Sequence, residues 1–476
     1  GLAFYRILER LFPEGHPYRH STIGSMADLD AASVEAMRQW FRENYGPNNA
    51  VLVLAGDINA AEARPLVERY FGQIPRGPQN EPAQADVPTL SARVDDVMHD
   101  RVSNTRLYRT WIVPGINHED TTDLTIGASV LGGLASSRLD RILVRDEESA
   151  VSVSSSLLPF QRVSMFFVTV DVKPGVDAGA VSQRLDQIIA EYVANGPTAD
   201  EIQRVATQQV AGALFNIEQV GGFSGKTVAL ANGAVIAGDP GFFRRDLLSY
   251  GEATPESVRD AMGRWLSRPV HALRIDPGAR EAYQEASATN RPRPDPTPPR
   301  VTPRDPMPPI GEIADLDFPN VERARLSNGM EIVYAHRDAI PVTLVAFDFN
   351  AGVSADPQGG FGTQRLMLSA MTEGAGGRDS MQIAEEQERL GANISAGGSL
   401  DRSAVTLTAL SANLGLSLDL LADIVMRPDF TPDDVSRLRD QQLAAVAAEA
   451  TQPNGLAQRA LPPIIYGANH PYGRPL

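Results

Sequence analysis

The stretch TADEIQRVATQQVA, residues 198–211, occurs a second time in the chain as TPDDVSRLRDQQLA, residues 431–444. Both copies open with threonine and carry an acid three residues on, which is the signature of a helix N-terminus. Their matching apolar positions exchange only among Ile, Val and Leu. The stretch therefore predicts two equivalent helices at an offset of 233 residues (431 − 198), and so a fold built from repeated units.

Two further matches extend this period along the chain. Gly1-Leu2-Ala3 and His16-Pro17-Tyr18 recur as residues 455–457 and 470–472, both at an offset of 454 (455 − 1). Residues 36–41 share Ala, Met and Trp with residues 261–266 at an offset of 225 (261 − 36). One unit therefore spans about 225–233 residues, and two units give the longer period. We expect an internal fragment of a longer protein, cut at equivalent points two units apart.

The amino-acid composition excludes or disfavours several kinds of partner and binding site. The 476 residues carry a formal net charge of −16, which disfavours binding to nucleic acid or an anionic membrane surface. The chain has no cysteine, so disulfides and thiolate metal sites are excluded. Apolar runs such as residues 50–55 are far shorter than the roughly 18–20 residues of a membrane span.

The hydrophobic patterns show that each unit mixes strands and helices. We predict an α+β fold in which each unit has a mainly antiparallel sheet with helices on one face, with two units in each half. Strands are predicted at residues 50–58 and 162–172, with residues 150–157 as hairpin partner of the latter. Helices are predicted at residues 30–45 and 180–195. Their apolar stripes, which we expect to face the core, are Val34, Met37, Phe41 and Tyr45 in the first helix and Val181, Leu185, Ile188, Ile189, Tyr192 and Val193 in the second.

Proline marks the boundary between the larger first part of the chain and its C-terminal part. Nine of the eighteen residues from Pro292 to Pro309 are proline, which predicts an extended linker. After it, Asn328-Gly329 between apolar runs predicts a β-hairpin. The expected domains are the C-terminal part of a first unit (1–85), a second unit (97–285), a linker (286–320) and an incomplete third unit (321–476).

The third unit carries a family resemblance. Its ordered set LSNGM, AGVSADPQGGFG, EGAGGRDS and LGANISA, with HPYGRP at 470–475 and SSRL at 136–139, resembles the insulinase/pitrilysin-type zinc metallopeptidases, also called inverzincins, which are related to mitochondrial processing peptidase. The resemblance covers essentially the whole chain and is typical of members with four tandem units. It implies that the first unit, to which residues 1–85 belong, is the catalytic one. It also implies a zinc cofactor in the parent protein, peptide substrates, and the remaining units of the same parent as partners.

The family's zinc motif, H-x-x-E-H on a helix with a further Glu roughly 75 residues later, is absent from this sequence. In the third unit, the motif's three functional positions hold Arg365, Leu368 and Ser369, and the later Glu position falls near Ala445, with Glu449 as the nearest acid. We therefore assign no catalytic residue and no metal ligand, and we expect the chain alone to bind no zinc. His16 and His20 have metal-ligand spacing, but Pro17 prevents a helix between them, so an ordinary loop is the preferred interpretation.

Arg138 is the one site residue carried over from the resemblance. An arginine on the helix after the S-S-R element contacts the substrate peptide in the resembled family, and a guanidinium suits this because it offers several fixed donors to peptide carbonyls. The tyrosine that often accompanies it is replaced here by Val151. The alternative is a helix-surface arginine with a structural role, paired with an acid such as Glu147 or Glu148.

These observations predict part of a zinc-dependent metalloendopeptidase that cleaves peptides or unfolded proteins in a chamber between paired halves, with this chain inactive alone. The alternative is a non-catalytic peptide-binding or scaffold protein of the same fold. We expect no nucleic-acid partner and no membrane span, and a location in the periplasm or cell envelope of a bacterium.

Overall fold

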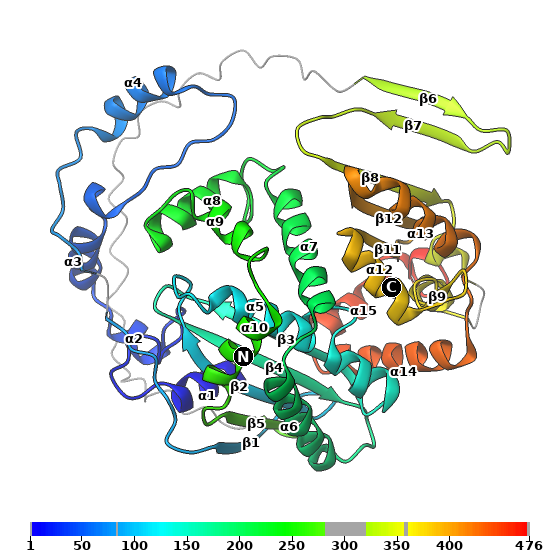
Figure 1. Cartoon of the computed structure of the whole chain (residues 1–476), viewed down its shortest axis with the longest axis horizontal. Coiled ribbons are helices and arrows are strands. Elements are labelled where there is room, and N and C mark those ends of the chain that lie inside the picture. The colour runs from blue at the N-terminus through cyan, green and yellow to red at the C-terminus, as the bar shows by residue number, and fades with distance from the viewer. Residues whose placement is uncertain (1, 82–83, 281–319, 357–359, 474–476) are drawn as a thin grey trace.

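The computed structural model describes residues 2–81, 84–280, 320–356 and 360–473. Two bodies of sheet and helix lie side by side, one within residues 84–280 and the other within residues 320–473 (Figure 1). A helical arm, residues 26–81, runs around the outside of the first body. The structure is thus the α+β arrangement that the sequence predicts, with mainly antiparallel sheets.

The first body is built on a five-stranded sheet in the order β1-β5-β2-β4-β3. Its strands are β1 (Val94–Asp100), β2 (Arg106–Pro114), β3 (Ala150–Pro159), β4 (Val163–Val172) and β5 (His271–Pro277). Only β1 and β5 pair in parallel, and the other neighbours are antiparallel. The β3–β4 hairpin confirms the predicted pairing of residues 150–157 with 162–172.

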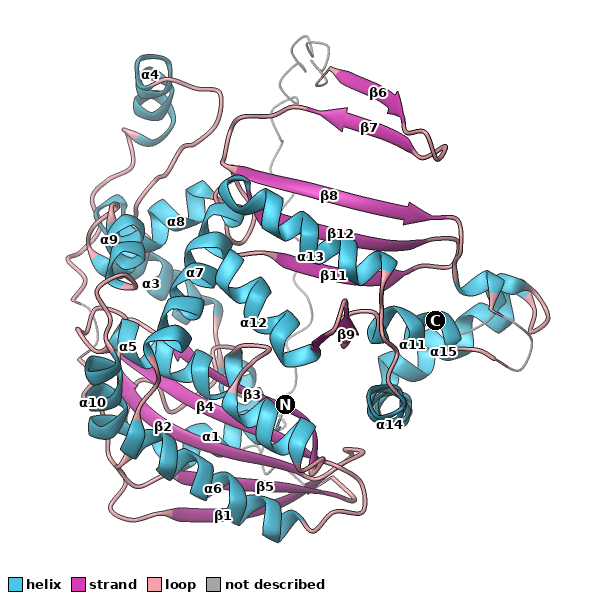
Figure 2. Ribbon diagram, turned by 45° about the vertical axis from the view of Figure 1, so that its right-hand side comes forward, coloured by secondary structure: helices cyan, strands magenta, loops and turns pink. Residues whose placement is uncertain are grey.

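Helices and a buried apolar core cover one face of this sheet (Figure 2). They are α5 (Thr121–Ala128), α6 (Ala178–Asn195), α7 (Ala199–Asn216) and α10 (Pro255–Leu266), with π-helical turns at Ser129–Gly133 and Asp140–Asp146. The helices α8 (Lys226–Asn232) and α9 (Phe242–Ser249) follow α7 in the chain and contribute no residue to this core. The stripe predicted for residues 180–195 is confirmed, because Val181, Leu185 and Tyr192 of α6 are buried in this core. Thr198 caps α7 through a complete capping box with Glu201, also as predicted.

The opposite face of the same sheet is covered by α1 (Leu2–Leu11). Ile7, Leu11 and Phe12 pack there against apolar residues of the strands such as Met98 and Leu273, and all five are almost fully buried. Arg6 and Arg10 add ion pairs of 3.0 Å to Asp96 on β1. The sheet is therefore covered by apolar side chains on both faces.

The second body has a smaller sheet in the order β11-β12-β8, also antiparallel. Its strands are β8 (Val342–Phe349), β11 (Asn393–Gly398) and β12 (Ser403–Leu410), and a short pair joins β9 (Gly374–Ala375) to β10 (Arg378–Asp379). Its helices are α11 (Thr363–Ala370), α12 (Ser380–Leu390), α13 (Leu414–Met426), α14 (Pro432–Glu449) and α15 (Pro453–Tyr466), with 3-10 turns at Val353–Ala355, Ser411–Asn413 and Pro471–Gly473. Thr431 accepts a hydrogen bond from the Asp434 amide and caps α14, as the repeated stretch predicts.

The predicted hairpin around Asn328-Gly329 is confirmed. Strands β6 (Val321–Arg325) and β7 (Glu331–Ala335) pair in an antiparallel register, and Gly329 has φ +91° in the turn, a conformation that costs glycine little. The proline-rich linker predicted at 286–320 lies, except for Asn320, outside the described residues.

The helical arm contains the helix predicted at residues 30–45, but that helix is shorter than predicted and its apolar stripe is exposed. The arm contains α2 (Met26–Ala31), α3 (Val34–Asn44), a 3-10 turn at Pro47–Asn49 and α4 (Ala60–Phe71). Ser33 accepts a hydrogen bond from the Ala36 amide and starts α3, so residues 30–45 are not one helix. The stripe of Val34, Met37, Phe41 and Tyr45 is 51–63% exposed rather than core-facing.

Residues 50–58, predicted as a strand, form none. A strand exists only as part of a hydrogen-bonded ladder, and no strand among the described residues lies beside this run. Val51, Leu52 and Leu54 are accordingly about half exposed, at 50%, 54% and 49%. The run has the apolar composition of a strand, but the partner that a strand requires is not provided here.

Candidate functional site

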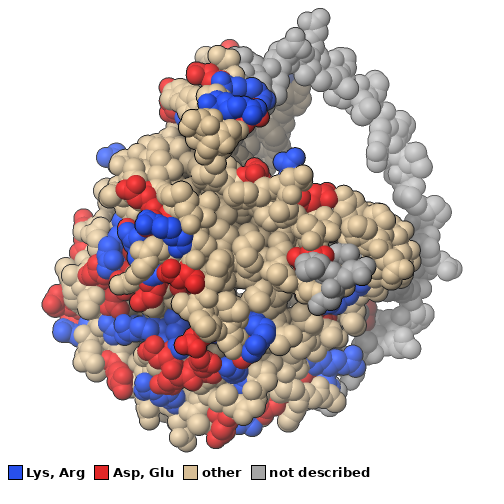
Figure 3. All heavy atoms as spheres, turned by 90° about the vertical axis from the view of Figure 1, so that its right-hand side faces the viewer, with Lys and Arg blue, Asp and Glu red and all other residues tan. Residues whose placement is uncertain are grey.

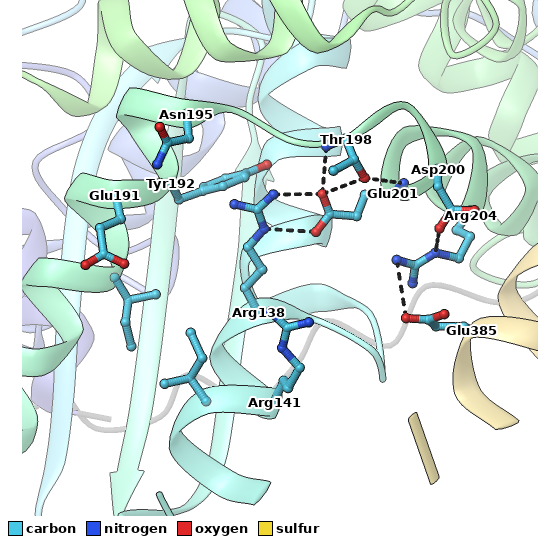
Figure 4. Close-up of a pocket in the computed structure, with 12 residues that line it drawn as sticks. Arg138, Arg141, Glu191, Tyr192, Asn195, Thr198, Asp200, Glu201, Arg204 and Glu385 are labelled. Carbon is cyan, nitrogen blue, oxygen red and sulfur yellow. Dashed lines mark hydrogen bonds and ion pairs between the residues drawn. The ribbon is translucent and has the colours of Figure 1, made fainter. Parts of the chain in front are cut away.

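Arg138 lies at the junction of the two bodies, close to the N-terminus of α7 (Figure 4). Its Nε donates to Glu201 Oε1 at 2.9 Å and its Nη2 to Glu201 Oε2 at 2.8 Å, which makes a bidentate pair. Nη2 also donates to the Gly196 carbonyl oxygen at 3.1 Å, and the guanidinium carbon lies 4.8 Å from the Tyr192 ring centroid. The remaining nitrogen, Nη1, has no hydrogen-bond partner among the described residues.

The partner of Arg138 is therefore not one of the acids suggested by the sequence. Glu147 pairs with Arg184 at 2.8 Å and Glu148 pairs with Lys173 at 3.0 Å. Both acids follow Arg138 closely in sequence, whereas Glu201 is brought to it by the docking of α7. The sequence showed Glu201 only as a residue of a capping box, and nothing in that pattern names the arginine that it binds.

Glu201 has two roles at once. Its Oε2 accepts from the Thr198 backbone amide at 2.7 Å, which completes the capping box, while its two oxygens hold Arg138. Burial raises the pKa of Glu201, but the hydrogen bonds from Arg138 and Thr198 outweigh burial and hold the pKa below its ordinary value. The carboxylate is therefore charged at neutral pH and fixes the position of Arg138.

A hollow of about 400 Å³ opens beside this pair. Its walls come from α6, α7 and the turn after Arg138, and Glu385 of α12 closes it from the second body (Figure 4). Arg141 is exposed at its edge and has no ion pair with any described residue. The hollow thus offers one free guanidinium and the unused Nη1 of Arg138 to a ligand rich in hydrogen-bond acceptors, such as a peptide backbone.

Charged side chains also join the two bodies beside the hollow. Arg204 of α7 donates to Glu388 of α12 at 2.6 Å, and both side chains are about 95% buried. Glu388 Oε2 also accepts from the Ser136 hydroxyl at 2.5 Å. At the other end of the contact, Arg145 Nη1 donates to Glu373 at 2.9 Å. These pairs fix how the second body sits against the hollow.

Sequence reasoning missed Arg145 and Glu373. Arg145 also pairs with Asp140 at 2.7 Å, and Glu373 also accepts from Arg437 at 2.6 Å. The one available signal was the repeat itself. Arg204 and Arg437 occupy equivalent positions in the two copies of the repeated stretch, and each binds a buried or half-buried glutamate. Elsewhere on the face shown in Figure 3, acidic and basic side chains are interspersed, so the net negative charge forms no single patch there.

The zinc positions of the resembled family hold side chains that do not fit the metal. On α11, Leu368 is buried in the apolar core, while Arg365 and Ser369 are exposed. Ala445 lies on α14, which packs against α11, and Glu449 is bound to Arg459 at 2.5 Å. A guanidinium, an isobutyl group, a hydroxyl and a methyl group cannot replace two imidazoles and two carboxylates. Among the described residues, no group of three or more His, Asp or Glu side chains is arranged to hold a metal ion.

His16 and His20 lie in a turn after α1. His16 Nε2 lies 3.1 Å from the Asp86 carbonyl oxygen, and its ring stacks on Phe12 at 4.7 Å. His20 Nδ1 lies 3.3 Å from the Ser21 carbonyl oxygen, so the two rings make separate backbone contacts. The matching His470 stacks on Tyr466 in the same way, at 5.6 Å.

Comparison with protein families matches most of the chain in two blocks. Residues 31–209 match the peptidase M16 inactive domain, and residues 331–476 match insulinase, peptidase family M16. The chain belongs to peptidase family M16. The first block includes Arg138 and the part of α7 up to residue 209, and the second includes the helix α11, on which the zinc ligands are absent.

Two curated relatives of this M16 chain are named as zinc proteases. Zinc protease PqqE of Helicobacter pylori is 24% identical over 226 residues, which is 46% of this chain and 50% of the relative. An uncharacterised zinc protease of Mycobacterium leprae is 26% identical over 202 residues, 42% of this chain and 45% of the relative. The M16 chain thus matches only about half the length of each curated relative.

Solved structures give the same fold. A crystal structure of a protease from Helicobacter pylori aligns with a TM-score of 0.52 and 18% identity, covering 58% of this M16 chain and 67% of that one. The peptidase M16 inactive domain from Pseudomonas fluorescens aligns with a TM-score of 0.50 and 21% identity, covering 60% of this chain and 66% of that one. The described helices of the M16 chain include none long and apolar enough to cross a membrane.

Proposed function

We propose that this chain forms non-catalytic, peptide-binding walls of a zinc-dependent metalloendopeptidase, which cleaves peptides or unfolded proteins in a chamber between paired halves. The observation that carries the proposal is α11, where Arg365, Leu368 and Ser369 stand at the zinc positions of an M16 domain. Because these side chains cannot hold zinc, the third unit contributes shape and contacts rather than chemistry. The match of residues 31–209 to the M16 inactive domain supports the same role for the second unit.

In the intact parent, hydrolysis belongs to another unit of the same protein that carries H-x-x-E-H and a later Glu. Zinc in such a unit supplies an activated water and polarises the peptide carbonyl. The residues of this chain bind and orient the peptide and exclude bulk water. Arg138 and Arg141 are the candidate donors to peptide carbonyls, because both border the hollow at the junction of the two bodies.

The second candidate function is a non-catalytic peptide-binding or scaffold protein of the same fold, in which no unit is a peptidase. The lost ligands of the third unit favour it for that half of the chain. The parent sequence discriminates between the two: H-x-x-E-H followed by Glu in another unit supports the peptidase, and its absence supports the scaffold. The periplasmic or cell-envelope location stays a prediction, which fractionation of the source cells checks.

The proposal is tested with the purified chain in two measurements. Elemental analysis after dialysis is expected to find no stoichiometric zinc, and quenched fluorescent peptides are expected to stay uncut with or without added zinc. Fluorescence anisotropy with labelled unfolded peptides is expected to show saturable binding that weakens in an Arg141→Ala variant. One tightly held zinc per chain together with chelator-sensitive cleavage contradicts the non-catalytic role, and the absence of peptide binding leaves the scaffold as the better account.

A further inference from the structure

A second hollow, of about 380 Å³, lies within the first body, between the C-terminal half of α7 and the helices α8 and α9. These three helices are neighbours in Figure 1, and Figure 2 shows them on the opposite side of the molecule from α11. Most of its lining is apolar or small, and the remainder is amide, hydroxyl and one carboxylate. The lining residues used below are Gly212, Ala213, Phe243, Asp246, Leu247 and Tyr250.

One face of α9 forms the wall of this hollow. Phe243, Asp246, Leu247 and Tyr250 follow each other at i, i+3, i+4 and i+7, so they lie along one side of the helix. Asp246 is therefore a carboxylate set within an apolar stripe, where a core-facing helix would ordinarily carry another apolar side chain. Its position on this face requires an explanation.

Asp246 has no side-chain ion pair or hydrogen bond with any described residue. Its neighbour Arg245 is directed elsewhere, towards Asp239 at 3.5 Å and over the Phe242 ring at 5.1 Å. Burial raises the pKa of Asp246, and the nearby Arg245 only partly offsets this. A half-buried carboxylate without a partner is unfavourable in the free protein, and a cation entering the hollow relieves that cost.

We propose that this hollow binds a lysine or arginine side chain of an extended peptide, with the cationic head at Asp246. The aliphatic stem of such a side chain packs on Phe243 and Leu247, because long basic side chains bury their methylene groups while keeping the charge paired. The proposal rests on the peptide-binding function above and specifies which substrate side chain is recognised. Phe223, fully exposed at the rim, offers a further apolar contact to the neighbouring peptide residue.

The α7 wall leaves room for this side chain. Gly212 and Ala213 present almost no side chain, and a Cβ built on Gly212 meets no atom within 4 Å. A larger residue at position 212 therefore projects into free space rather than into the core. Because Gly212 has an ordinary helical backbone, replacing it with leucine also favours the helix. Gly212→Leu is thus a steric block that does not threaten folding.

The test uses two fluorescent peptides that differ at one position, lysine in one and the neutral isostere norleucine in the other. The whole chain is expected to bind the lysine peptide about 10- to 100-fold more tightly, the range of a charge-assisted hydrogen bond. Asp246→Asn is expected to abolish this preference while leaving the affinity for the norleucine peptide unchanged. Glu252→Gln, a matched loss of one nearby acid outside the hollow, is expected to keep it. Gly212→Leu is expected to weaken both peptides.

The outcomes separate this proposal from the proposed function. If both peptides bind equally to the unmodified chain, or if Asp246→Asn keeps the preference, peptide binding stands and the assignment of this hollow is wrong. If neither peptide binds, the peptide-binding function itself fails and this inference fails with it. Circular dichroism of each variant at 25 °C confirms that a loss of binding is not a loss of folding.

Discussion

Replacing Arg138 with alanine separates a structural arginine from a substrate-binding one. The side chains of Arg138 and Glu201 are only 22% and 15% exposed, and the variant leaves Glu201 without two charge-assisted hydrogen bonds. Breaking a fully buried ion pair lowers the free energy of unfolding by about 3–5 kcal/mol, and breaking an exposed pair lowers it by about 0–1 kcal/mol. Because this pair is partly buried, we expect an intermediate loss of about 2–3 kcal/mol. For a unit of this size, that loss lowers the melting temperature by roughly 4–12 °C.

The pH dependence of this loss identifies its cause. The folded-state pKa of Glu201 lies below the ordinary value of 4.5, because the Arg138 and Thr198 hydrogen bonds outweigh the effect of burial. A depressed carboxylate pKa stabilises the fold above the ordinary pKa, and the stabilisation is lost as the pH falls through the folded-state pKa. The difference in stability between the unmodified chain and Arg138→Ala is therefore expected to be full at pH 7 and to shrink below about pH 4.5.

Thermal melts of the unmodified chain, Arg138→Ala, Glu201→Ala and the double variant across this pH range measure the pair directly. Arg141→Ala serves as the matched control, because Arg141 borders the same hollow with no ion pair among the described residues. We expect Arg138→Ala to melt lower and Arg141→Ala to melt unchanged. A variant Arg138→Ala that melts like the unmodified chain while binding peptide 10- to 100-fold more weakly refutes the structural account and supports a substrate clamp.

The remaining predictions concern packing between and within the two bodies. Glu388→Ala removes the buried partner of Arg204 in the second body and leaves Arg204 paired with Asp200 of its own helix, at 2.9 Å. We therefore expect the contact between the bodies to lose about 3 kcal/mol, the low end for a broken buried pair. Limited proteolysis is expected to cut earlier between the bodies, and an unchanged digestion pattern contradicts this. Trp265→Ala is expected to destabilise the fold by about 3–5 kcal/mol, because Trp265 is 8% exposed and donates to Asp120 at 2.7 Å. Trp40 is the matching residue of the arm and is 59% exposed, so Trp40→Ala is expected to change the free energy of unfolding by less than about 0.5 kcal/mol. Equal denaturation midpoints for Trp265→Ala and Trp40→Ala count against the burial argument.

Local signals in the sequence were enough for elements whose partners are close along the chain. The β3–β4 hairpin, the hairpin around Gly329 and the caps Thr198 and Thr431 each depend on residues within a few positions of one another. The stripe of α6 was also readable, because a helix with one wide apolar face must cover a core. The ordered motifs of the third unit likewise pointed to the M16 family without any knowledge of contacts.

What the sequence could not decide was which surfaces meet. The stripes around Trp40 and Trp265 have the same pattern, yet the first is exposed on the arm and the second lies in the core of the first body. Residues 51–55 have the composition of a strand but no ladder beside them. The apolar pattern of a segment shows which of its side chains can be buried. Whether they are buried depends on the surface that the tertiary structure places against them.

The candidate sites divide in the same way. The sequence by itself established that the zinc ligands are missing from α11, because ligand identity is a property of the residues at the motif positions. It could not show that Glu201 holds Arg138, or that Asp246 stands without a partner in an apolar hollow. Charge pairing in a folded chain depends on side chains that approach through space from distant segments, so the role of each charged residue was decided by the tertiary structure.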